Sequence, residues 1–197
     1  MKSFFQRYVI LLPFLFFVAG RALAIPTLEF APSAQTVNLG EQATVDINVT
    51  GLTGEFIGAY DFDVNWDSSL LSLASVDFGT SLGGPLDSFQ DSLGFIGAVN
   101  VAELSLLFDL SGLQTGFDSF TLFSLTFDTL ATGTSSLDFA PSLAGFLVDD
   151  FGFELQTDAS AIGSITIEQQ AAVPEPGVPA LLALGLLVFG LMRRRSA

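Results

Sequence analysis

Apolar and polar residues alternate with a period of two along most of this chain, and this pattern limits the fold more than any other feature. In the stretch YDFDVNWD (60–67), aromatic and aliphatic residues occupy one parity, while acids and an amide occupy the other. Successive side chains of a β-strand point to opposite faces. The stretch therefore predicts a strand with one buried and one solvated face. The same alternation occurs in ATVDINVT (43–50), FTLFSLTFDTL (120–130) and GSITIE (163–168).

Clusters of Gly, Asp, Ser and Thr separate these segments, and such clusters favour turns. Fifteen phenylalanines between residues 25 and 173 can fill a core between two sheets. We therefore expect an all-β fold, a jelly-roll β-sandwich over 25–168, because many short strands with turns between them are typical of that class. About nine strands are expected, near 27–31, 35–39, 43–50, 57–66, 70–78, 95–109, 120–130, 136–140 with 144–149, and 162–168.

The N-terminal residues 1–24 have the organisation of a secretory signal peptide. Lys2 and Arg7 precede a short apolar run, and Ala22 and Ala24 form an A-x-A cleavage site. We expect a signal helix that is removed after Ala24, and the alternative is an N-terminal anchor that is retained. The remaining chain would then be exported.

The C-terminal residues divide into a linker (169–177), an apolar run (178–192) and a basic tail (193–197). The apolar run is at the short limit for a transmembrane helix. The arginines that follow it would keep the tail in the cytoplasm and leave everything upstream outside. We expect a transmembrane helix here, with a buried core helix as the alternative.

Charge is distributed very unevenly along the chain. All six basic residues lie outside 25–173, whereas of the 21 acidic residues only Glu175 does, so this segment carries 20 acids and no base. It also has no His and no Cys. Nucleic acid is excluded as a direct partner, because nothing can neutralise its phosphates. Disulfides are excluded as well, so burial of apolar side chains must stabilise the domain.

The C-terminal segment resembles the PEP-CTERM sorting signal of exported bacterial proteins. The motif VPEP is followed by an apolar run and an arginine cluster, in the order of that signal, through Val173, Pro174, Glu175, Pro176, Arg193, Arg194 and Arg195. The resemblance implies processing by an exosortase in a Gram-negative bacterium that makes extracellular polysaccharide. The protein would first be a membrane-anchored precursor and would then reach the cell surface or the extracellular matrix.

The body of the chain resembles the cohesin family and related carbohydrate-binding sandwiches. The segments VNLGEQATVDINVTGL (37–52) and GAYDFDVNWDSSLLSLASVDFG (58–79) carry this resemblance: a glycine-acid turn leads into an alternating strand, and an aromatic-aspartate pair closes the next one. The resemblance implies a nine-stranded jelly-roll sandwich that binds carbohydrate or a protein partner. No binding residues transfer with it.

Acidic side chains could in principle hold calcium, and the candidates are Asp61, Asp63, Asp67, Asp149 and Asp150. A helix–loop–helix calcium site requires Gly at its sixth position and Glu at its twelfth. Counting from Asp61, these positions hold Trp66 and Ser72. We therefore expect the acidic row of residues 61–67 to be a solvated strand face. Asp149 and Asp150 are expected in a turn, and weak calcium binding is the alternative for both groups.

The residue types available restrict catalysis. Residues 25–173 contain no His or Lys that could act as the general base for a serine nucleophile. The usual activated-serine active sites are therefore excluded. Paired carboxylates would permit glycoside hydrolysis, but no pair stands out. We therefore expect no enzyme, no cofactor and no catalytic residue, and interpret the chain as a surface or matrix protein. The alternatives are a polysaccharide-degrading hydrolase or accessory module, and a cohesin-type docking scaffold.

Overall fold

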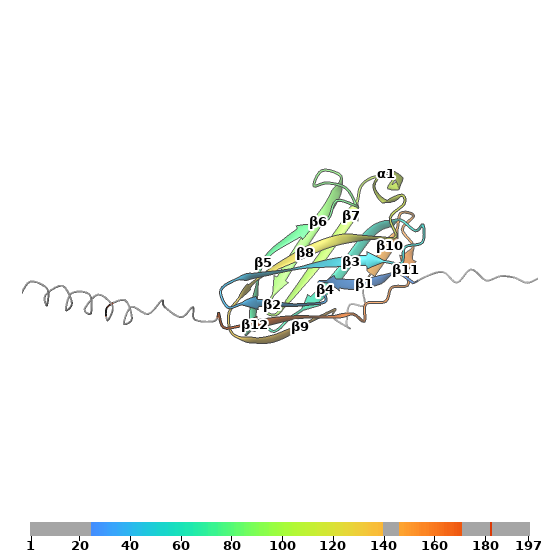
Figure 1. The fold of residues 1–197 in the computed structure, drawn as a ribbon. Coiled ribbons are helices and arrows are strands. Elements are labelled where there is room, and N and C mark those ends of the chain that lie inside the picture. The colour runs from blue at the N-terminus through green and yellow to red at the C-terminus, as the bar shows by residue number, and fades with distance from the viewer. Residues whose placement is uncertain (1–24, 140–145, 171–181, 183–197) are drawn as a thin grey trace, which may run out of the picture.

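The computed structural model describes residues 25–139, 146–170 and 182, and the first two ranges form a β-sandwich (Figure 1). A four-stranded and an eight-stranded sheet pack face to face. The strands are β1 (Thr27–Ala31), β2 (Ala34–Asn38), β3 (Gln42–Thr50), β4 (Ile57–Asn65), β5 (Leu71–Phe78), β6 (Ser88–Phe95), β7 (Ala98–Ser105), β8 (Ser119–Thr129), β9 (Gly133–Phe139), β10 (Phe146–Asp149), β11 (Glu154–Leu155) and β12 (Ile162–Glu168), with one short helix, α1 (Ser111–Gln114).

The smaller sheet has the order β1-β3-β8-β5 and is antiparallel throughout. The larger sheet is organised around β4. One edge of β4 pairs with β7, which in turn pairs with β6, and the other edge pairs with β10 over its first half and with β9 at its end. From β9 the sheet continues through β12 to β2, and the β12–β2 pair is parallel.

Gly58 allows β10 to lie close against the start of β4. A Cβ atom added at this position would lie 2.6 Å from the Asp149 backbone carbonyl oxygen, so a side chain here would force the two strands apart.

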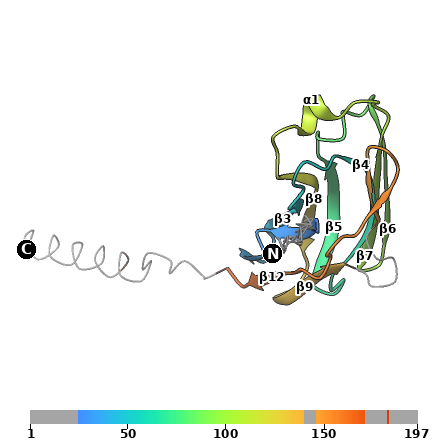
Figure 2. The same cartoon turned by 90° about the vertical axis from the view of Figure 1, so that its right-hand side faces the viewer.

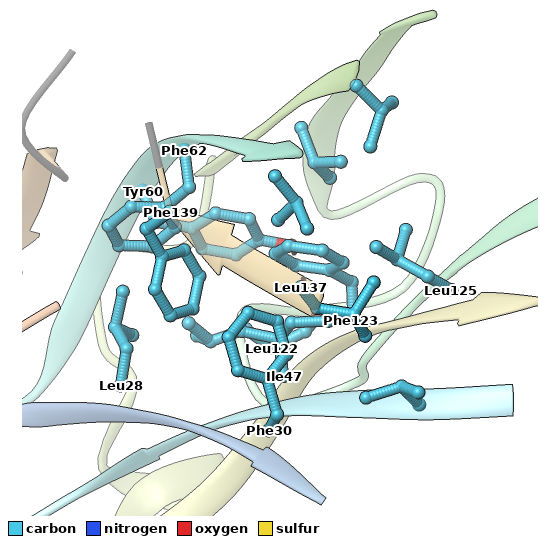
Figure 3. Close-up of a cluster of buried hydrophobic side chains, with 14 of the residues drawn as sticks. Leu28, Phe30, Ile47, Tyr60, Phe62, Leu122, Phe123, Leu125, Leu137 and Phe139 are labelled. Atoms are coloured by element: carbon cyan, nitrogen blue, oxygen red, sulfur yellow. Dashed lines mark hydrogen bonds between the residues drawn. The ribbon is translucent and has the colours of Figure 1, made fainter. Parts of the chain in front are cut away.

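The core lies between the two sheets and is rich in aromatic rings (Figure 3). Tyr60 stacks on Phe62 and on Phe123 of the opposite sheet, with ring centroids 5.8 and 5.7 Å apart. Phe30 stacks on Phe139 at 4.7 Å, again across the sandwich. Rings at these separations contribute attraction beyond the area that they bury. The aromatic residues of the alternating pattern therefore connect the two sheets.

The expected alternation of buried and solvent-facing side chains over residues 60–67 is confirmed. Tyr60, Phe62, Val64 and Trp66 are all buried, and none of the four polar residues between and after them is. The indole N–H of Trp66 donates to the Leu71 carbonyl oxygen at 3.0 Å, which satisfies its one polar group.

The all-β sandwich prediction is also confirmed, but the number of strands was underestimated. The described residues form twelve strands rather than about nine. The strand expected at 95–109 is β7, which begins only at Ala98 and forms a hairpin with β6. β6 lies in a segment that was expected to consist of turns. The expected strand at 136–140 with 144–149 is split into β9 and β10, and β11 and α1 are additional.

The two ends of the sandwich differ, and we name them the tip and the base. The tip is the end formed by residues 51–56, 79–87, 106–118 with α1, and 150–153 (Figure 2). β8 starts directly after the tip, β9 starts at the far end, and Ile167 near the end of β12 pairs with Gly133 at the start of β9. The last strand therefore ends at the base.

The expected signal peptide (1–24) lies outside the described residues. So do all of the expected transmembrane segment (178–192) except residue 182, and the basic tail (193–197). Among the residues that are described, no helix has the length and apolar character needed to cross a membrane.

Candidate functional site

The larger sheet exposes apolar side chains on the surface that faces away from the core. We name the surface of β4, β6 and β7 on this side the outer face. Its exposed apolar members are 51–63% accessible, and they are Phe89, Leu93, Phe95 and Leu104. The register aligns Phe89 with Leu104 and Phe95 with Ala98. An exposed group of large apolar side chains on one surface is typical of a binding site rather than of ordinary protein surface.

Amide groups hold the acidic row at the middle of the outer face. The side-chain amide of Asn100 donates to Asp61 Oδ1 at 2.6 Å and to Asp63 Oδ1 at 2.8 Å. The Asn65 amide donates to Asp138 Oδ1 at 3.2 Å. These neutral donors stabilise the neighbouring carboxylates without cancelling their charge. The outer face therefore combines apolar side chains at β6 and β7 with negative charge at β4.

A buried polar cluster lies directly beneath this face. Glu103 of β7 points inward and is 2% exposed. Its Oε1 accepts hydrogen bonds from Ser88 Oγ at 2.7 Å and from Gln90 Nε2 at 2.9 Å, both on β6. Its Oε2 lies 3.0 Å from the Tyr60 hydroxyl of β4. The cluster links the three strands of the outer face, which makes their relative positions rigid.

Tyr60 also reaches the smaller sheet through this cluster. Its hydroxyl oxygen lies 3.1 Å from the Leu122 carbonyl oxygen on β8. Burial and, secondarily, the nearby Glu103 carboxylate raise the pKa of the Tyr60 phenol well above its usual range. The phenol therefore stays protonated and remains a hydrogen-bond donor.

The structure separates the calcium candidates into different places. Asp61 and Asp63 share the Asn100 amide on the outer face. Asp67 begins a turn at the base, where Ser69 donates through both its backbone N–H (2.9 Å) and its hydroxyl (2.6 Å) and lowers the pKa of the Asp67 carboxyl. No group of three or more metal-ligating residues forms within the described ranges.

Asp149 is the last residue of β10 and Asp150 lies in the turn that follows it at the tip, so the expected turn begins one residue later than predicted. Asp149 Oδ1 accepts hydrogen bonds from the backbone N–H groups of Phe151 and Phe153 at 2.9 and 2.7 Å. This carboxylate therefore stabilises the β10–β11 turn. The sorting-motif residues 173–176 and 193–195, and the cleavage-site residues 22 and 24, lie outside the described residues.

The sequence interpretation missed the outer face because it missed β6. The segment SFQDSLGF (88–95) alternates, with Phe89, Leu93 and Phe95 on one parity and Ser, Gln and Gly on the other. This is the reverse of the usual arrangement, since the polar Ser88 and Gln90 face Glu103 inside while Phe89, Leu93 and Phe95 face solvent. The alternation was the available signal, but the Gly and Ser residues around it indicated a turn.

The architecture and this surface can be compared with known proteins. A family model described as Cohesin domain matches residues 29–150, more than half of the chain. This chain belongs to the cohesin family. No curated protein matches it significantly.

Solved cohesins share the fold at low sequence identity. The seventh ScaB type I cohesin of Pseudobacteroides cellulosolvens has a TM-score of 0.60 at 19% identity, over 77% of this chain and 97% of that one. The sixth cohesin of scaffoldin B from Acetivibrio cellulolyticus, in complex with a dockerin, gives 0.59 at 17% identity, over 73% and 99%. A non-cellulosomal cohesin from the archaeon Archaeoglobus fulgidus gives 0.55 at 15%, over 75% and 94%. The cohesin fold expected from residues 37–79 is therefore confirmed.

Proposed function

We propose that this cohesin is a non-catalytic protein-binding module whose outer face docks a dockerin-type partner. The exposed apolar side chains of β6 and β7, set beside the amide-bridged acids of β4, are the observation that supports this function. Related cohesins, from Acetivibrio cellulolyticus and Clostridium thermocellum, are described in complex with dockerins. Protein interfaces combine an apolar centre with polar groups around it, and the outer face has this composition.

The partner's contribution follows from the charge of the module. Residues 25–173 contain no Lys, Arg or His, so every ionic contact must come from a basic group on the partner. The Asp61 and Asp63 carboxylates provide acceptors for such groups. A dockerin surface with apolar residues and a neighbouring Lys or Arg would complement this face.

The binding experiment uses the purified full chain over a panel of immobilised dockerin domains in surface plasmon resonance. We expect at least one dockerin to bind, and a chain with Phe89→Ser and Leu93→Ser to bind it at least about tenfold more weakly, since centrally placed apolar side chains dominate interface energies. Thr134→Ala, on the same side of the larger sheet at β9, is the matched control and should change the affinity less than about twofold.

Polysaccharide is the alternative ligand. If a glycan array detects binding while no dockerin binds, or if the Phe89→Ser and Leu93→Ser chain binds the dockerin as well as the unmodified chain does, the proposal of a protein-docking face is wrong. Phe89 and Phe95 offer rings on which a sugar could stack, whereas Leu93 and Leu104 do not, so the glycan array and the dockerin panel are needed together to separate the two ligands.

We also propose that the module is an exported protein that an exosortase sorts to the cell surface or matrix of a Gram-negative bacterium. Two sequence features support this localisation: the signal-peptide pattern of residues 1–24, and the VPEP motif, apolar run and arginine cluster of residues 173–195. The intact mass of protein recovered from the cell surface or medium should lack Met1–Ala24 and Arg193–Arg195. Full-length protein found only in the cytoplasm would contradict the proposal.

A further inference from the structure

The tip exposes a further set of large apolar side chains, at the end of the sandwich beyond the strands of the outer face. Phe108 and Leu86 are almost fully accessible, at 107% and 94%. Phe117, Phe151 and Phe153 are each more than half exposed. Leu106 is also more than half exposed, and six such residues at one end of a small domain are more than the singly scattered apolar residues of an ordinary surface.

These side chains come from segments that the fold brings together. Leu86 precedes β6 and Phe108 follows β7, and the two segments are joined by the Leu106 N–H donating to the Asp87 carbonyl oxygen at 2.8 Å. Phe151 and Phe153 lie within the β10–β11 turn, on the other side of β4. Figure 2 shows α1 and these connections at the same end of the sandwich.

A buried glutamine fixes the α1 segment to the rest of the tip. Gln114 Nε2 donates to the Ile57 and Ser81 carbonyl oxygens at 2.8 and 3.0 Å, and Gln114 Oε1 accepts from the Ile57 N–H at 2.7 Å. One side chain therefore holds three segments of the tip in register. The tip surface is pre-organised, which reduces the entropy lost on binding.

The tip also contains a pocket of about 410 Å³ between the 53–56 turn and the 114–118 segment. Phe56 and Phe117 line it together with Asp118. The Asp118 carboxylate accepts a hydrogen bond from the backbone N–H of Thr53 at 3.1 Å and so fixes the turn, in which Thr53 has a φ of 39°. A carboxylate can accept about four hydrogen bonds, so most of its capacity is available to a ligand.

The charge of the tip determines which occupant it can accept. Asp87, Asp109, Asp118, Asp149 and Asp150 lie within or beside its segments, and residues 25–173 contain no base to neutralise them. Hydrogen bonds from Ser111 lower the pKa of the Asp109 carboxyl. A second copy of this chain would bring like charge against like charge, and an anionic lipid surface would be repelled in the same way.

We propose that the tip is a second docking surface, for a protein that presents apolar residues together with Lys or Arg, and that the 53–56/114–118 pocket receives one of those basic side chains. The aliphatic stem of a Lys or Arg packs against Phe117, and its cationic end binds the Asp118 carboxylate. Phe108 and Leu86 contact apolar residues of the same partner. The tip residues lie in the connecting segments rather than in β4, β6 and β7, and the inference does not depend on a dockerin binding to the outer face.

A displayed library of random peptides is selected for binding to the purified full chain. Clones that also bind a variant chain with Phe108→Ser and Phe117→Ser are then removed. We expect the remaining clones to combine apolar residues with Lys or Arg. A synthetic peptide from this set should bind the Phe108→Ser, Phe117→Ser chain at least about tenfold more weakly in fluorescence anisotropy, as expected for residues central to an interface. Asp118→Asn should weaken binding as well, and to a greater extent at low salt.

The chain with Phe89→Ser and Leu93→Ser is the matched control, since it removes exposed apolar residues from the outer face only. It should bind the peptide within about twofold of the unmodified chain. The proposal is overturned if no tip-dependent clones remain, or if these clones lack basic residues. It is also overturned if sedimentation velocity or a phosphatidylserine vesicle assay shows that the Phe108 and Phe117 side chains instead mediate self-association or lipid binding.

Discussion

Tyr60 is the residue whose environment is most tightly defined. Its ring packs between Phe62 and Phe123, and its hydroxyl lies within hydrogen-bond distance of both Glu103 Oε2 and the Leu122 carbonyl oxygen. The phenol is the only side chain in residues 25–173 that ionises in alkaline solution, because this segment contains no Lys, Arg, His or Cys and no second Tyr. The alkaline stability of the sandwich therefore depends on one group.

Tyr60 should make the protein unstable at high pH. The pKa of Tyr60 is raised in the folded state, so its contribution to stability is complete below the unfolded pKa of about 10 and is lost as the pH rises above it. The free energy of unfolding should fall by about 1.4 kcal/mol per pH unit above pH 10. Urea melts across this range measure the slope.

Tyr60→Phe provides the control for this prediction. The variant should be less stable at neutral pH by about 1 kcal/mol, because a buried hydrogen bond is lost, but its stability should not change between about pH 9 and 11. If the free energy of unfolding falls equally steeply with pH above pH 10 in both proteins, a group other than Tyr60 must be titrating.

At the scale of elements, β6 is an edge strand whose inward contacts are largely polar. Ser88 and Gln90 turn toward Glu103, while Phe89, Leu93 and Phe95 remain exposed. Its position therefore depends on the Glu103 carboxylate as well as on the backbone ladder to β7.

Glu103→Ala should loosen β6 selectively. The substitution leaves the Ser88, Gln90 and Tyr60 donors without their buried acceptor, and such losses cost about 3 kcal/mol or more. Hydrogen exchange should accelerate most at the amides of β6. Asp91→Ala, on the exposed side of the same strand, is the control and should change stability by less than about 0.5 kcal/mol. Uniform acceleration across both sheets would contradict a local role.

The same element shows where sequence reasoning succeeded and where it failed. Strands such as β3, β4 and β8 were located because each buries one apolar parity, and burial is what the alternation reports. β6 was missed because its inward parity is polar, and its stability comes from a glutamate in the following strand, which no local pattern reveals. The acidic row was correctly interpreted as a solvated face, but its pairing with Asn100 depends on the register between β4 and β7.

At the scale of the whole molecule, the dominant property is uncompensated negative charge. Residues 25–173 carry 20 acids and no base, and amide and hydroxyl donors, as at Asp61 and Asp67, take the place of ion pairs. Local hydrogen bonds stabilise individual carboxylates but leave the total charge unchanged. Self-repulsion over the whole sandwich therefore opposes the compact state.

Salt should stabilise the protein without requiring a specific cation. Raising the sodium chloride concentration should increase the Tm modestly by screening, and millimolar calcium should have a similar effect through diffuse binding. Thermal melts followed by circular dichroism test both. A stoichiometric calcium isotherm at micromolar concentration, abolished by Asp61→Ala or Asp149→Ala, would contradict this expectation and indicate a preformed site.

The parallel pairing of β2 with β12 has a consequence for the order in which this protein can fold. These strands come from opposite ends of the domain sequence, and β12 also supplies the second partner of β9. The larger sheet therefore cannot be completed until β12, the last strand, has been synthesised. Contacts between segments that are distant in the sequence also form slowly. If the chain is exported, as proposed above, the larger sheet can be completed only after β12 has crossed the membrane.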